Sequence, residues 1–182
     1  MPATNLADAT RLGVVVIGRN EGMRRIAAVA PGLEFIQFID GDCELMPGWL
    51  DTAARVLDQH LTAAAVCGRR RERHPEHSVY NLLCDMEWDT PIGQTLACGG
   101  DVLVRTEALR QVVGFRDDLI AGEEPELCVR LRAKGWSIWR LDAEMTLHDA
   151  ASVFRSARFT TCCATSNGTR RSVKPRPAAV TC

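Results

Sequence analysis

The sequence lacks long apolar runs, and its longest ones, such as Leu12 to Ile17, are short. A helix that crosses a membrane needs about 20 consecutive apolar residues, so no transmembrane segment is expected. No signal peptide is expected either, since the first 25 residues show no basic start followed by an apolar stretch and a cleavage site. We therefore expect a cytoplasmic location, and leave open a peripheral association with a membrane.

The chain has little net charge, with 22 basic and 23 acidic residues and a formal charge of −1. The charges are unevenly placed, because residues 151–182 carry six basic residues and no acidic one. Residues 1–150 therefore hold 16 basic against 23 acidic residues, a net of −7. An acidic body argues against a general nucleic-acid binder, whose affinity comes largely from neutralising phosphates. No nucleic-acid partner is expected.

The eight cysteines form no C-x-x-C pair and show no zinc-finger spacing. We expect mostly buried, reduced thiols in a reducing compartment. With 46% hydrophobic and 25% charged residues, the 182-residue chain has the composition of one ordinary globular domain.

Apolar stretches bounded by turn residues alternate with amphipathic or capped stretches along residues 12–148. The expected strands are 12–17, 33–39, 63–67, 136–141 and 145–148, with a loop and then a strand over 97–104. The expected helices are 20–29, 47–61, 106–113 and 123–135, and residues 74–96 are expected to be irregular. Strands that alternate with helices predict an α/β domain with a mostly parallel sheet.

Residues 151–182 break this pattern. They show little periodicity, and the run Lys174-Pro-Arg-Pro177 cannot continue a regular element. We predict a domain over residues 1–150 followed by a basic, disordered tail over residues 151–182.

Two carboxylates, Asp40 and Asp42, directly follow the expected strand 33–39. Residues i and i+2 of an extended chain project to the same side, so both can face one point. Clustered carboxylates attract Mg²⁺ or Mn²⁺, and open α/β sheets bind ligands at the carboxyl ends of their strands. Taken alone, the tripeptide Asp40-Gly-Asp42 also fits an ordinary surface turn.

Three further carboxylates, Glu123, Glu124 and Glu126, open the expected helix 123–135. Acidic residues stabilise a helix N-terminus through the helix dipole, which is the simplest interpretation. Crowded like charges also raise the pKa of a carboxyl group, so a general base is the functional alternative.

Two more positions could take part in chemistry. His148 follows the last expected strand and would be a third metal ligand if a loop returns it to Asp42. The turn Cys98-Gly-Gly-Asp101 would allow close approach of a ligand to its backbone, with Asp101 bound to a hydroxyl. A surface histidine and a common glycine turn are the alternatives.

The order of these segments resembles that of family 2 glycosyltransferases, which have the GT-A fold. The resemblance covers residues 12–150 and is carried by several motifs in the same order. These are Val15-Val-Ile-Gly-Arg-Asn-Glu21, the D-x-D-like Asp40-Gly-Asp42, Glu44-Leu-Met-Pro-Gly-Trp49, Gly99-Gly-Asp-Val-Leu-Val-Arg105, Gly114-Phe115, and the E-D-like segment from Gly122 to Arg132 with Gly135-Trp136.

The resemblance implies metal-dependent, inverting transfer of a sugar from a nucleotide-sugar donor to an acceptor hydroxyl. It implies Mg²⁺ or Mn²⁺ as the cofactor, with Asp42, Asp40 and His148 as the metal ligands. Glu124 takes the place of the general base, with Glu where the family usually has Asp. The residues implied in substrate binding are Asp40, Gly99, Gly100, Asp101 and Glu123.

The chain also departs from the family. Only 22 residues, 18–39, lie between the end of the first strand and Asp40, too few for the two strands and the nucleotide-gripping loop found there. We expect a truncated GT-A fold with an internal deletion, an exposed sheet edge and an altered C-terminus. Two other functions stay open: a catalytically impaired remnant that only binds metal or nucleotide-sugar, and a phosphate-transferring or nucleotidyl enzyme that uses the same carboxylates.

Overall fold

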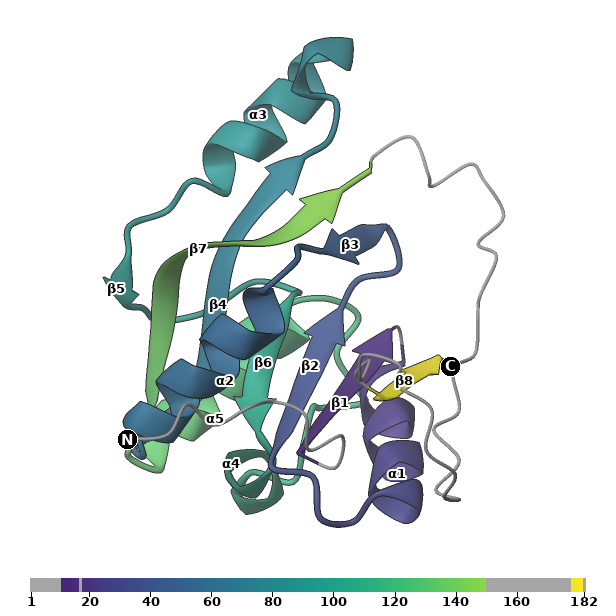
Figure 1. The fold of residues 1–182 in the computed structure, drawn as a ribbon, viewed down its shortest axis with the longest axis vertical. Coiled ribbons are helices and arrows are strands. Elements are labelled where there is room, and N and C mark those ends of the chain that lie inside the picture. Colours follow the sequence, from purple (N-terminus) through teal and green to yellow (C-terminus); the bar gives the residue numbers. More distant parts are fainter. Residues whose placement is uncertain (1–10, 17, 150–177, 182) are drawn as a thin grey trace, which may run out of the picture.

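The computed structural model describes residues 11–16, 18–149 and 178–181 (Figure 1). The strands are β1 (Leu12–Val16), β2 (Phe35–Ile39), β3 (Cys43–Leu45), β4 (Ala63–Glu72), β5 (Gly93–Gln94), β6 (Val102–Arg105), β7 (Ser137–His148) and β8 (Ala178–Thr181). The helices are α1 (Arg19–Val29), α2 (Trp49–Gln59), α3 (Val79–Glu87), α4 (Thr106–Gln111) and α5 (Glu123–Ala133), with a 3₁₀ turn, η1, over Pro75–His77.

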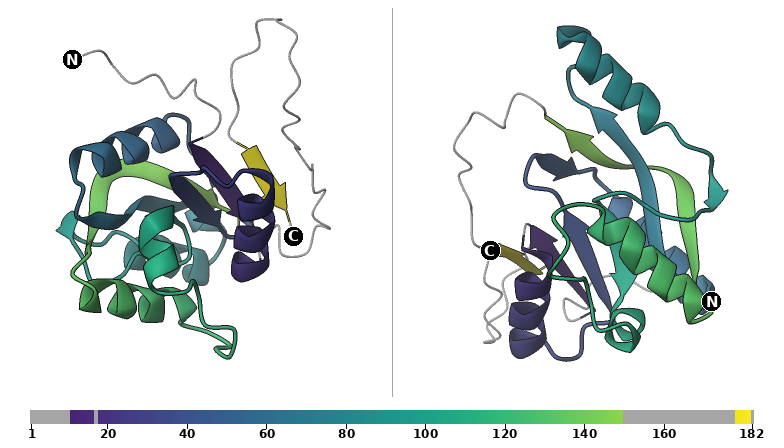
Figure 2. Two further views of the ribbon diagram at one scale, coloured as in Figure 1. Left: turned by 90° about the horizontal axis from the view of Figure 1, so that it is seen from below. Right: turned by 180° about the vertical axis from the view of Figure 1, so that it is seen from behind.

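The strands form one sheet in the order β3-β7-β4-β6-β2-β1-β8, with β5 paired to β7. Strands β8, β1, β2, β4 and β7 run in one direction, and β6, β3 and β5 run against them. Helix α2 covers one face of the sheet, whereas α1, α4 and α5 cover the other (Figure 2). The expected α/β class, with a mostly parallel sheet flanked by helices, is confirmed.

The central strands are apolar because helices cover both of their faces. All five residues of β2 are buried, including the polar Gln37. The Gln37 side chain accepts a hydrogen bond of 2.8 Å from Trp49 Nε1 on α2, and donates one of 2.6 Å to the carbonyl oxygen of Phe38. This pairing of polar atoms inside the core fixes α2 against β2, the strand that Asp40 follows.

Strands β1 and β2 are parallel neighbours, and α1 is the one helix between them in the chain. The packing of α1 on β1 is close, because a Cβ atom on Gly22 would lie 2.3 Å from Val15 Cγ1. On its other side β1 pairs in parallel with β8. The edge of the sheet on this side is therefore β8 and not β1.

The predicted disordered tail falls largely outside the described residues. Within it, residues 178–181 form β8 instead, since the open edge of β1 offers main-chain partners that no local sequence pattern reveals. The predicted irregular stretch 74–96 is also corrected in part, because η1, α3 and β5 lie within it. Helix α3 extends from the end of β4, away from the sheet (Figure 1).

None of the helices that the structure describes is both long and apolar enough to cross a membrane.

Candidate active site

Asp40 follows β2 at the carboxyl end of the strand. Its backbone N–H donates to Asp101 Oδ1 at 2.8 Å. Its carboxylate accepts hydrogen bonds from two guanidinium groups, Arg19 at 3.1 Å on Oδ1 and Arg70 at 2.7 Å on Oδ2. Both oxygens of this predicted metal ligand are therefore engaged by cations of the protein itself.

Asp101, predicted to bind a substrate hydroxyl, is buried at the centre of the same network. Besides the amide of Asp40, it accepts hydrogen bonds from Arg70 Nε at 3.1 Å and Thr146 Oγ1 at 2.7 Å. Burial lowers the pKa of Arg70, but Asp101, Cys43 and Asp40 raise it above its ordinary value, so the guanidinium stays charged. In this arrangement Asp101 positions Asp40 and Arg70.

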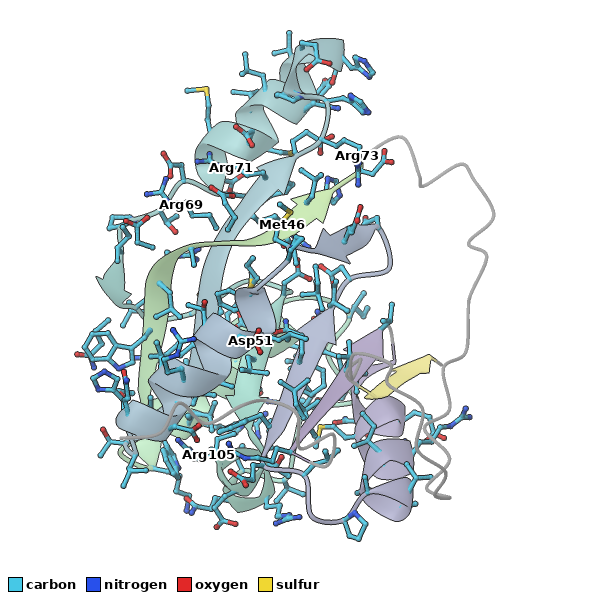
Figure 3. The ribbon with its side chains drawn as sticks, viewed as in Figure 1. Met46, Asp51, Arg69, Arg71, Arg73 and Arg105 are labelled. Carbon is cyan, nitrogen blue, oxygen red and sulfur yellow. The ribbon has the colours of Figure 1, made fainter. Side chains whose placement is uncertain are left out.

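The alternation of β4 separates two sets of charged residues, because successive side chains of a strand point to opposite faces. Arg69, Arg71 and Arg73 are labelled along β4 and its end in Figure 3. Each of them pairs with carboxylates other than Asp40 and Asp42. Arg69 pairs with Asp89 and Asp142, Arg71 with Asp85 and Glu144, and Arg73 with Glu44 and Asp149. Arg70 and Glu72 alternate with these arginines and reach the site.

Asp42 lies against His148. Strand β3 pairs antiparallel with β7, with Cys43 opposite His148, and this register brings the two side chains together. Asp42 Oδ2 lies 3.2 Å from His148 Nε2. The other ring nitrogen, Nδ1, lies 2.5 Å from Oε2 of the buried Glu72.

Glu72 was not predicted from the sequence. It is the one carboxylate inside the basic run from Arg69 to Arg73, which is the signal that could have drawn attention to it. A buried carboxylate among arginines has to be paired, and here its partners are His148, the backbone N–H of His74 at 3.2 Å and Asn81 Nδ2 at 3.4 Å.

The residues at Asp42 fit a divalent cation in part. A carboxylate and an imidazole face each other, and a second carboxylate holds the far nitrogen of the imidazole, as metal-binding histidines usually require. Asp40 does not join them, because its oxygens contact Arg19 and Arg70. Among the described residues, the one triad of ligand atoms all within 4.8 Å of one another lies elsewhere.

Glu124, the predicted general base, is buried at the start of α5. Its Oε1 and Oε2 accept the backbone N–H groups of Cys98 and Gly99, each at 2.9 Å. The Cys128 thiol also donates to Oε1, at 2.8 Å. Glu124 thus fixes the glycine turn against α5.

Glu123, in contrast, is ion-paired with Arg19 and lines a cavity of about 340 Å³. The cavity lies at the carboxyl ends of β1 and β2, and its lining includes Asp40, Arg116 and Asp117. Ligands of open α/β sheets bind at such strand ends. Both charge signs are present, so the cavity offers donors for phosphates and acceptors for hydroxyls.

A second cavity, of about 200 Å³, lies beside the glycine turn and is lined by Gly99, Gly100, Asp101, Arg70 and Trp88, among others. A side chain at Gly100 would displace the Asp40 carboxylate, because a Cβ atom there would lie 2.2 Å from Asp40 Oδ2. The structure thus brings the predicted residues of the turn next to Asp40. At Gly100 the part of the turn that lies against the Asp40 carboxylate is backbone.

Comparisons with known proteins reveal similarity of fold at low sequence identity. No protein-family model matches the chain, and no curated protein matches it. Among solved structures, S. aureus TarS 1-349 is 11% identical, with a TM-score of 0.51 over 79% of this chain and 62% of TarS.

Two further structures fall just below that level of similarity. The mannosyltransferase PcManGT from Pyrobaculum calidifontis, solved with GDP-Man and Mn²⁺, is 16% identical, with a TM-score of 0.48 over 81% of this chain and 58% of PcManGT. A197 from STIV is 11% identical, with a TM-score of 0.49 over 72% of this chain and 82% of A197. The chain thus spans less than two thirds of TarS and of PcManGT, and it shares with TarS a mixed α/β fold with a mostly parallel sheet.

Proposed function

We propose that this chain transfers a sugar, with inversion, from a nucleotide-sugar donor to an acceptor hydroxyl, with Mg²⁺ or Mn²⁺ as the cofactor. The observation that carries the proposal is the contact between Asp42 and His148, backed by Glu72. Asp42 follows Asp40 by two residues in the chain, and Asp40 lines the 340 Å³ cavity.

The geometry of His148 supports a cation at this position. If Nδ1 donates its hydrogen to Glu72, the lone pair of a neutral ring is on Nε2 and faces Asp42 Oδ2, at 3.2 Å. Two acceptors this close need a proton or a cation between them. Asp42 and His148 are thus the residues that would hold the ion, and when bound it would neutralise the departing diphosphate.

The 340 Å³ cavity is the proposed donor site. Arg19 offers charged N–H groups for phosphate oxygens, and Asp40 and Glu123 offer acceptors for sugar or ribose hydroxyls. Gly99 and Gly100 would contribute close backbone contacts. Asp101 would act by holding Asp40 and Arg70 in place.

Glu124 stays the proposed general base because of its place in the E-D-like pair. The Cys98–Gly99 backbone stands between it and the 200 Å³ cavity, so the turn has to shift before an acceptor hydroxyl reaches it. Glu123 lines the larger cavity directly and is the second candidate for the base.

The burial of Glu124 also favours a second function, in which the chain binds metal or nucleotide-sugar but does not catalyse transfer. A base whose oxygens both serve internal hydrogen bonds can hold a loop without removing a proton. Release of free nucleoside diphosphate from a nucleotide-sugar on addition of acceptors separates transfer from binding alone, and from nucleotidyl chemistry. In a transferase, the loss of turnover in Glu123→Gln or Glu124→Gln identifies the base.

Calorimetric titration of the full chain with UDP and GDP, with and without Mn²⁺, tests the donor site. We expect metal-dependent binding that Asp42→Ala abolishes. The matched control, Glu107→Ala, removes an exposed carboxylate on α4, and should bind as the original chain does. Equal binding by Asp42→Ala would contradict the metal site, and no binding by the folded chain would contradict the donor site.

A further inference from the structure

Three potential metal-ligating side chains meet on η1, outside the candidate active site. His74, Glu76 and His77 each offer one ligand atom, and these three atoms all lie within 4.8 Å of one another. Glu76 Oε1 lies 3.6 Å from His74 Nδ1 and 3.4 Å from His77 Nε2. No other described triad of His, Cys, Asp or Glu meets this distance condition.

These spacings match those of a tetrahedral zinc site. Zinc binds nitrogen and oxygen ligands at about 2.0 to 2.2 Å, so a tetrahedron of such bonds separates neighbouring ligand atoms by about 3.3 to 3.6 Å. The two measured distances from Glu76 fall at this separation. The imidazole rings of His74 and His77 are stacked, parallel within 7° and with centroids 4.4 Å apart. Since the lone pair of an imidazole lies in its ring plane, one of these exposed rings has to turn before both nitrogens point at one ion.

The backbone that carries the three residues is fixed by the neighbouring segments. His74 N–H donates to Glu72, and its carbonyl oxygen accepts from Asn81 Nδ2 at 3.0 Å and from His77 N–H at 3.1 Å. Pro75 restricts the backbone between the first two ligands. The ligands are thus presented by an ordered turn, which lowers the entropy that binding has to overcome.

We propose that His74, Glu76 and His77 form a surface site for a divalent transition-metal ion, with Zn²⁺ as the expected occupant and water at its fourth position. Two imidazoles and one carboxylate suit Zn²⁺, whereas Mg²⁺ prefers oxygen ligands alone. The ligand side chains are 39–67% exposed, so the ion enters directly from solvent. This site does not depend on the proposed transferase function.

The site adjoins Glu72 but is separate from the Asp42 and His148 pair. Glu72 contacts the His74 N–H through Oε1 and His148 through Oε2, so one residue links the two positions. Metal titrations of the chain therefore have to distinguish them. Asp42→Ala removes the first position and leaves the ligands of η1 intact.

Titration of the full, chelator-treated and reduced chain with Zn²⁺ tests the proposal. The reference protein and every variant carry Asp42→Ala, so that the Asp42 and His148 position does not contribute. We expect His77→Ala and His74→Ala each to weaken Zn²⁺ binding tenfold or more, since loss of a mere outer partner of a metal ligand already costs about 10- to 100-fold. His60→Ala is the matched control, because that histidine lies elsewhere, stacked on Trp139.

Co²⁺ as a second probe separates this site from the cysteines. Bound at η1, it should give visible absorption without a thiolate charge-transfer band, and the signal should disappear in the double variant His74→Ala/His77→Ala. Unchanged Zn²⁺ affinity in that variant would overturn the proposal. So would a thiolate-dominated Co²⁺ spectrum, or the absence of Zn²⁺ binding by the folded chain. Circular dichroism verifies that each variant is folded.

Discussion

At the scale of single residues, alternation along β4 decides which charges reach the candidate active site. Arg70 contacts Asp40 and Asp101, and Glu72 contacts His148, whereas the neighbouring arginines pair elsewhere. The five charged residues from Arg69 to Arg73 form one basic segment in the sequence, but in a strand their side chains divide between two faces. Within this run, the buried Glu72 gives the clearest prediction, because its carboxylate contacts the proposed metal ligand His148.

Glu72→Gln should weaken Mn²⁺ binding by about 10- to 100-fold, the usual cost of losing the partner that orients a metal-binding histidine. The neutral amide no longer supports His148 Nδ1–H with a full negative charge. Titration followed by the electron paramagnetic resonance of free Mn²⁺ measures the change. Glu44→Gln, an exposed carboxylate on β3, serves as the control, and equal affinity of both variants would exclude a positioning role for Glu72.

Gly100→Ala should lower the free energy of unfolding by about 1–3 kcal/mol, the typical cost of overpacking. The new Cβ atom would lie 2.2 Å from an Asp40 oxygen that Arg70 holds, so the carboxylate has to leave an ion pair. Urea denaturation measures the loss. Gly32→Ala is the matched control, because no atom lies within 4 Å of its Cβ position. A Gly100 variant as stable as the Gly32 variant would refute this packing argument.

At the scale of elements, β1 has a pairing partner on each side. The short connection through α1 leads to its neighbour β2, which pairs with it in parallel. The pairing with β8 joins residues that lie far apart in the chain, Gly13 to Val16 with residues 178–181. An unpaired strand edge is a template for association with other chains, so β8 protects the sheet at this position.

Deletion of residues 178–182 should expose that edge of β1. We expect faster hydrogen exchange at the β1 amides that face β8, and concentration-dependent self-association in sedimentation experiments. Deletion of Cys182 alone is the control, since it leaves the four residues of β8 in place. Unchanged exchange in the longer deletion would show that the pairing contributes nothing to the stability of the edge.

At the scale of the whole molecule, the strand order assembles the candidate site from distant segments. His148 is 106 residues from Asp42 and 76 from Glu72, and Arg19 is 104 residues from Glu123. The antiparallel pairing of β3 with β7 and the parallel pairing of β4 with β7 bring the first three side chains together. The mixed α/β fold thus supplies the geometry on which both the metal and the donor proposals rest.

The sequence by itself determined the local features. The apolar runs and caps predicted β1, β2 and helices α1, α2, α4 and α5 nearly at their observed bounds, because burial and capping impose periodic patterns on neighbouring residues. It also placed Asp40 and Asp42 at the end of a strand, and Glu123 and Glu124 at the start of a helix.

Only the tertiary structure decided how these residues are used. It placed Arg19 and Arg70 on Asp40, Glu72 behind His148, and Glu124 beneath the glycine turn. Each of these contacts joins segments more than 20 residues apart. Strand order and register decide such contacts, and no local periodicity encodes them.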